Sequence, residues 1–136
     1  MLQSEQIAER WLLMLGAVPG YKGYRYLLKS VCLIIEDAEP NYHISGRLYK
    51  RVAMLYGTSP SNVEKGIARL IKSINWTKKK LELISLESTG DKLEPPTSAK
   101  LITLLSCHVA IERRLAKRAC GEPQKKLLRG KRSLLR

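Results

Sequence analysis

Residues 48–74, LYKRVAMLYGTSPSNVEKGIARLIKSI, decide the predicted fold, because they read as a helix, a tight turn and a second helix. Gly57 follows the first helix, where a left-handed residue ends a helix with least strain. Ser59 then has the position of an N-cap, and Pro60 stands at the first helical position, where its missing N–H costs nothing. Four residues of the first helix recur at helical spacing and are predicted to share one buried face: Leu48, Val52, Ala53 and Tyr56.

The second helix has an apolar stripe and a polar face on opposite sides. With about 100° per residue, the stripe predicted to be buried consists of Val63, Ile67, Leu70, Ile71 and Ile74. The opposite face consists of Ser61, Lys65, Ala68 and Lys72, flanked by Asn62, Glu64 and Arg69. This polar face is therefore expected to be presented to something outside the domain.

The spacing of three small or apolar residues is that of a helix-turn-helix. Ala53 lets the helices approach closely, Gly57 makes the turn, and Val63 lies six positions further on, where it locks the second helix against the first. A helix-turn-helix places its second helix, here residues 60–74, in the major groove of DNA. The same spacing also occurs at helical corners of bundles, where the polar face is only solvated.

The composition favours a polyanionic partner. The 136 residues include 25 Lys and Arg against 12 Asp and Glu, a net charge of +13. Residues 124–136 carry six of the basic residues and no acidic ones, so about half of the excess lies elsewhere. We expect one helical DNA-binding domain over residues 1–121 and a basic, flexible arm over residues 122–136. Such charge is typical of nucleic-acid binding rather than of an enzyme.

The remaining patterns are helical as well. A helix is expected near residues 4–15, capped by Ser4, and a core helix near 24–38, after a turn that includes Gly23. Ser45 would cap the first helix of the pair, and a short helix would end near residue 86. A last helix would run from Thr97 or Ser98 to about 119, with its apolar side formed by Leu101, Leu104, Leu105, His108, Ile111 and Leu115. The predicted fold is an all-α, compact bundle of about six helices without strands.

Neither catalytic nor metal chemistry is indicated. Cys32, Cys107 and Cys120 lie far apart, without the paired spacing of a zinc site. His43 and His108 have no ligand partners at metal spacing, and His108 is expected at the edge of the core. There is no phosphate loop, signal peptide or apolar run near the ~20 residues of a membrane span. We therefore expect a cytoplasmic protein that is no enzyme and needs no cofactor.

Four segments resemble a known family: LGAVPGYKGYRYL (15–27), LYKRVAMLYGTSPSNVEKGIARLI (48–71), Trp76 and PPTSAKLI (95–102). They are similar to the C-terminal DNA-binding effector domain of the response regulator that initiates sporulation in endospore-forming Firmicutes, the stage 0 sporulation protein A family. The resemblance implies six helices around a winged-helix-like helix-turn-helix without strands. It also implies binding to a short asymmetric DNA box, often as tandem head-to-tail copies, and regulation of transcription.

The chain departs from this family at the residues that read bases. The family uses arginines and a glutamate, and the glutamate is kept here as Glu64. The arginine positions hold Asn62, Lys65 and Ala68 instead, and Arg69 directly follows Ala68. Arginine binds guanine bidentately, which lysine does more loosely and alanine cannot do. No acidic pocket of a receiver domain precedes residue 15, so a stand-alone effector domain without phosphorylation control is expected.

These patterns assign roles to individual residues. The candidates for base reading are Ser61, Asn62, Glu64, Lys65, Ala68 and Arg69. The candidates for phosphate contact are Ser59, Lys72, Lys78, Lys79, Lys80, Arg113, Arg114, Lys117, Arg118, Lys125 and Lys126. For the lysine triplet and for the last helix, ordinary solvation and the helix dipole are the alternative explanations.

The expected partner is double-stranded DNA, with RNA polymerase and a homodimer on tandem sites as further expectations. Two alternative functions stay open. The same positive charge is equally typical of a protein that binds RNA or ribosomes. The same fold could instead bind a related transcription factor or RNA polymerase without touching nucleic acid.

Overall fold

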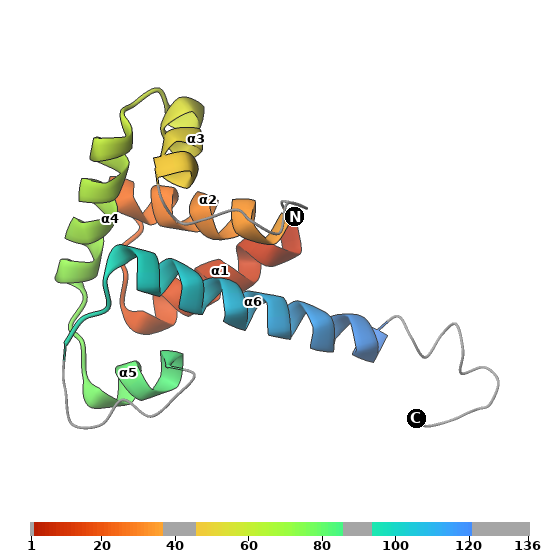
Figure 1. The fold of residues 1–136 in the computed structure, drawn as a ribbon. Coiled ribbons are helices and arrows are strands. Elements are labelled where there is room, and N and C mark those ends of the chain that lie inside the picture. The colour runs from red at the N-terminus through yellow and green to blue at the C-terminus, as the bar shows by residue number, and fades with distance from the viewer. Residues whose placement is uncertain (1, 37–45, 86–93, 121–136) are drawn as a thin grey trace, which may run out of the picture.

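Six α-helices make up the part of the chain that the structure describes, residues 2–36, 46–85 and 94–120 of a computed structural model (Figure 1). They are α1 (Leu2–Leu15), α2 (Lys22–Glu36), α3 (Gly46–Tyr56), α4 (Pro60–Ser73), α5 (Lys78–Ile84) and α6 (Ser98–Cys120). No strand occurs within these ranges. The prediction of an all-α bundle of about six helices is confirmed.

The centre of the bundle is α2, which packs against α1, α3, α4 and α6. Leu27 and Val31 of this helix are fully buried, and Ile34 and Ile35 pack at the edge of the same core. Burying one such side chain contributes about 1.5–3 kcal/mol. The sequence correctly predicted this segment as the core helix, although its predicted last residue, Ala38, and the predicted cap Ser45 lie outside the described residues.

Two residues near the N-terminus have other roles than predicted. Ser4 is not a cap, because α1 begins at Leu2 and Ser4 lies inside it, fully buried. Gly23 is not part of a turn, because α2 begins at Lys22. The predicted end of α1 is confirmed: Gly16 has a φ of 97°, and its N–H donates to the carbonyl of Leu13 over 3.0 Å.

The later helices begin at side-chain caps. Thr77 accepts a hydrogen bond from the backbone N–H of Lys80 over 3.1 Å at the start of α5. Thr97 accepts one from the N–H of Lys100 over 3.2 Å, so Thr97, one of the two predicted residues, caps α6. Such caps satisfy N–H groups that a helix leaves unbonded in its first turn. The helix α5 ends at Ile84, two residues before the predicted end.

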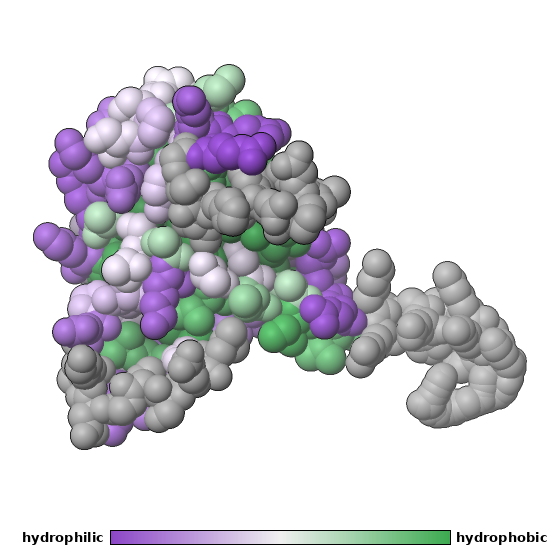
Figure 2. Space-filling view, in the orientation of Figure 1, coloured by the Kyte–Doolittle hydropathy of each residue, from purple (hydrophilic) through white to green (hydrophobic). Residues whose placement is uncertain are grey.

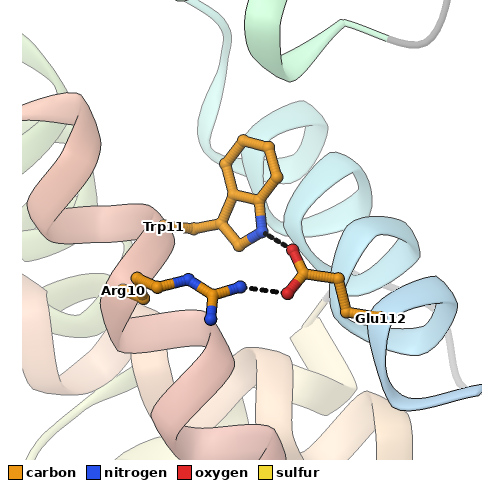
Figure 3. A network of polar contacts seen from close by, with 3 residues as sticks. All are labelled: Arg10, Trp11 and Glu112. Atoms are coloured by element: carbon orange, nitrogen blue, oxygen red, sulfur yellow. Dashed lines mark hydrogen bonds and ion pairs between the residues drawn. The ribbon is translucent and has the colours of Figure 1, made fainter. Parts of the chain in front are cut away.

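Helix α6 is fastened to α1 by Glu112, whose carboxylate receives two donors (Figure 3). Arg10 forms an ion pair with it, and the indole Nε1 of Trp11 donates to it over 2.8 Å. The ring of Trp11 also stacks on His108, with 4.3 Å between centroids. Nε2 of His108 lies 2.8 Å from the carbonyl oxygen of Ile84, so this histidine joins α6 to α5 at the edge of the core, as predicted.

The apolar side predicted for α6 is covered only in its first part. Leu101 and Leu105 are fully buried, but Ile111 and Leu115 are 43% and 57% exposed, so the predicted apolar side is not the buried side along the whole of α6. The side of α6 that packs against the bundle instead includes Ile102 and Val109, which are fully buried, and Glu112, which α1 binds; only the last turns of α6 extend past the other helices (Figure 1). At about 100° per residue, Ile111 and Leu115 therefore lie away from the buried side of α6.

Ser4→Ala is expected to raise the free energy of unfolding by about 1 kcal/mol, because the buried Ser4 hydroxyl has no hydrogen-bond partner among the described residues. Ser106→Ala is the control, since the Ser106 hydroxyl donates to the carbonyl of Ile102 over 2.7 Å. Urea denaturation should show a gain for Ser4→Ala only; an equal response of both variants would contradict this assignment.

Candidate nucleic-acid interface

The turn between α3 and α4 has the geometry that the sequence predicted. Gly57 has a φ of 65°, and Ser59 is extended, with a φ of −103° and a ψ of 155°. The hydroxyl of Ser59 accepts the backbone N–H of Asn62 over 3.2 Å, and Pro60 is the first helical residue. The N–H of Thr58 closes the end of α3 on the carbonyl of Ala53 over 2.9 Å. The cap, the proline position and the left-handed glycine are all confirmed.

The contact between α3 and α4 is formed by most, but not all, of the predicted residues. Leu48, Val52, Ala53 and Val63 are buried. Tyr56 is 40% exposed, so its predicted burial is wrong. It is the last residue of α3, and its ring makes an edge contact with the ring of Tyr26, with 5.5 Å between the two centroids. Tyr49, which the spacing argument missed, is buried instead. Its burial raises its pKa, and the nearby Glu64 carboxylate on α4 adds to this shift.

The predicted apolar stripe of α4 is confirmed in full. Val63, Ile67, Leu70, Ile71 and Ile74 are all buried, and Ile74 forms the C-cap. The indole Nε1 of Trp76 donates to the carbonyl of Ile71 over 2.9 Å, and the hydroxyl of Ser73 donates to that of Leu70 over 2.7 Å. These bonds add to the backbone bond from the N–H of Ile74 to the carbonyl of Ile71, over 3.2 Å, in pairing the carbonyls of the last turn.

Helix α4 rests on α2 at a crossing of two glycines, which the sequence did not reveal. A Cβ at Gly23 would lie 2.0 Å from the carbonyl oxygen of Gly66, and a Cβ at Gly66 would lie 3.0 Å from the ring of Tyr26. Of all helix pairs described, α2 and α4 share the most extensive contact. Glycine inside a helix costs about 1 kcal/mol relative to alanine, so Gly66 within the pattern of α4 was a signal of close packing.

The opposite side of α4 is open to solvent. Ser61, Glu64, Lys65, Arg69 and Lys72 are exposed, and Ala68 is half-buried between them. From Ser61 to Lys72 this surface extends about 16 Å along the helix axis, at 1.5 Å per residue. Figure 2 shows hydrophilic residues over α4 at the left of the molecule. Within the described ranges no ion pair neutralises its cations. We call these six residues the α4 outer face.

Asn62 is exposed beside the α4 outer face but is partly engaged. Its Nδ2 donates to the hydroxyl of Thr58 over 3.1 Å, which ties the side chain to the turn. One N–H and the amide oxygen of Asn62 remain for an outside partner.

The predicted phosphate contacts are distributed over several surfaces. Ser59 and Lys72 lie on or next to α4, and Lys78 and Lys79 are exposed in the first turn of α5. Lys80 is half-buried and already engaged, because its Nζ donates to the carbonyl of Asn75 over 2.9 Å. The remaining candidates are distant or undescribed. Arg113 and Arg114 lie in the half of α6 that extends away from α4 (Figure 1); the side chains of Lys117 and Arg118, and all of Lys125 and Lys126, lie outside the described residues.

The described residues contain no group of three histidine, cysteine or acidic side chains that could hold a metal ion. Burial raises the pKa of Cys32 to about 11, so this thiol stays protonated at neutral pH and is a poor nucleophile. No described helix is long and apolar enough to cross a membrane.

One family model matches the chain. It is described as "Sporulation initiation factor Spo0A C terminal" and covers residues 8–109, from the middle of α1 to the middle of α6. This span includes the helix-turn-helix, the glycine crossing and the α4 outer face. No solved structure matches the chain.

Proposed function

Because the chain belongs to the family of the C-terminal domain of the sporulation initiation factor Spo0A, a family of DNA-binding regulatory domains, we propose that it is a sequence-specific transcription regulator. In this proposal α4 enters the major groove of duplex DNA, which is wide enough to admit a helix. The proposal includes a place of action on the bacterial nucleoid.

The observation that supports this most directly is the α4 outer face. Its cations have no ion pair among the described residues, and the helix that carries them is packed against α2 and α3. Lys65, Arg69 and Lys72 lie along one side of a helix whose other side is fixed by α2 and α3. A base-reading helix needs both properties, because hydrogen bonds to base edges discriminate only when the side chains are held in register. The fixed platform is the glycine crossing at Gly23 and Gly66.

Within this proposal the residues of the α4 outer face divide by position. Lys65, at the centre, and Arg69, one turn later, would bind guanine O6 and N7, with arginine able to do so bidentately. Glu64 would accept from the amino group of cytosine, and Ser61, Asn62 and Ala68 would complete the contact with base edges. Lys72, at the end of α4, and Lys78 and Lys79 of α5 would meet phosphates, together with Ser59.

We expect duplex binding to depend strongly on salt. With roughly three to six phosphates neutralised, a plot of log affinity against log salt concentration should have a slope of about −3 to −5. Fluorescence anisotropy of a labelled duplex, titrated with the full chain at four or five salt concentrations, measures this slope. A slope near zero, or no binding to any duplex at low salt, contradicts the proposal.

The control for this measurement separates the basic arm from the helix that reads bases. Removing residues 124–136 should weaken binding to all duplexes and flatten the slope, because basic arms mostly contact phosphates. Preference among sequences should survive the truncation. A stem-loop RNA, titrated in parallel, tests the RNA-binding alternative: tighter binding to the stem-loop than to every duplex would favour it.

A further inference from the structure

The side of α3 that faces away from α4 is exposed and amphipathic. Met54 and Leu55 lie three to five positions after Lys50 and Arg51, about one helical turn, so the four exposed residues form one continuous surface, here named the α3 outer face. Met54 is 77% exposed and Leu55 is 54% exposed. A single exposed apolar residue needs no explanation, but here two consecutive large ones adjoin two cations.

A duplex held along the α4 outer face would not account for these residues. In Figure 1, α4 forms the left edge of the molecule and α3 lies to its right; α4 packs against both α2 and α3. In Figure 2, hydrophilic and apolar atoms lie over α3 at the top of the molecule. Lys50 and Arg51 could pair with the phosphates of DNA, but the apolar side chains of Met54 and Leu55 could not.

We propose that the α3 outer face is a docking surface for an acidic amphipathic helix of a protein partner. Carboxylates of that helix would pair with Lys50 and Arg51, neither of which has an ion pair among the described residues. Its apolar side chains would cover Met54 and Leu55. Methionine suits this use, because its flexible, polarisable side chain adapts to different partners. Helix docking through an apolar face flanked by charge is a recurring mode of recognition.

This inference goes beyond the proposed function, because it gives the domain a second surface that DNA leaves free. A regulator bound to DNA through α4 could hold a protein of the transcription machinery through α3 at the same time. The two surfaces lie on the two helices of one helix-turn-helix, so the partner would be placed close to the bound DNA.

The test uses the full chain and a synthetic probe. The probe is a labelled helical peptide with glutamate and leucine at spacings of three and four residues; a peptide of the same composition in scrambled order is its control. Fluorescence anisotropy measures binding to the wild type and to three double variants. Lys50→Glu/Arg51→Glu reverses the charges, Met54→Ser/Leu55→Ser removes the apolar part, and Lys22→Glu/Arg25→Glu makes the same charge change at exposed positions of α2.

The wild type is expected to bind the amphipathic peptide at least about tenfold more tightly than the scrambled one, a difference of about 1.4 kcal/mol. Both α3 double variants should lose this preference, while the α2 double variant keeps it. Equal binding of the two peptides, or retention of the preference by either α3 variant, overturns the proposal. So does a fall in duplex affinity for Lys50→Glu/Arg51→Glu that exceeds that of the α2 variant, because the surface would then contact phosphates. A loss of thermal stability in the α3 variants would also overturn it, since the face would then be bound within the chain.

Discussion

Replacing Gly23 with alanine is expected to lower the free energy of unfolding by about 3 kcal/mol or more. The added Cβ would lie 2.0 Å from the carbonyl oxygen of Gly66, and this neighbour is backbone, which cannot rotate away. The helices α2 and α4 would have to move apart, which opens the most extensive contact between any two described helices. Thermal unfolding should show a fall of roughly 10 °C in Tm.

Two glycine variants calibrate this result. Gly20→Ala should leave stability almost unchanged, because a Cβ there meets nothing within 4 Å. Gly66→Ala should have an intermediate effect, since its Cβ meets the ring of Tyr26 at 3.0 Å, and alanine favours the helix by about 1 kcal/mol. If Gly23→Ala were as stable as Gly20→Ala, the close crossing of α2 and α4 would be refuted.

The second large effect is expected at Lys65. Lys65→Ala should weaken binding to the preferred duplex by about 1–3 kcal/mol and relax the preference at one base pair. The side chain is exposed at the centre of the α4 outer face, so the change should leave folding intact. Titration against the preferred duplex and its single-base-pair variants measures both effects.

Lys72→Ala is the matched control, because it removes the same charge from the same face, nearer the end of α4. It should weaken binding to all duplexes alike, as expected for a phosphate contact. If Lys65→Ala also lowered affinity equally on every sequence, α4 would contact only the backbone and would not read bases.

The parts of the fold that the sequence predicted depend on local rules. The turn at Gly57, the cap at Ser59 and the proline at position 60 each satisfy backbone requirements within a few residues. The buried stripe of α4 follows from helical spacing alone, and so does the position of the exposed residues opposite it. The α4 outer face could therefore be predicted from the sequence as an exposed surface.

The parts that the sequence did not predict depend on contacts between distant segments. Gly23 was predicted to lie in a turn, but it is needed for the close contact with Gly66, which lies 43 positions later in the sequence. Ile111 and Leu115 were grouped with the apolar side of α6, but they are exposed, because α1 packs on the side that carries Val109 and Glu112. Lys80 belongs to a run of three lysines, yet its ammonium group is bound to the carbonyl of Asn75. Spacing along one helix contains no information about these partners.

The central claim, that α4 reads DNA sequence through its outer face, is tested most directly by selecting bound sequences from a random duplex pool with the wild type and Lys65→Ala in parallel. The wild type should enrich a short motif, and Lys65→Ala should enrich the same motif with one base pair relaxed. Enrichment of no motif by the wild type, or of an unchanged motif by the variant, would contradict the claim.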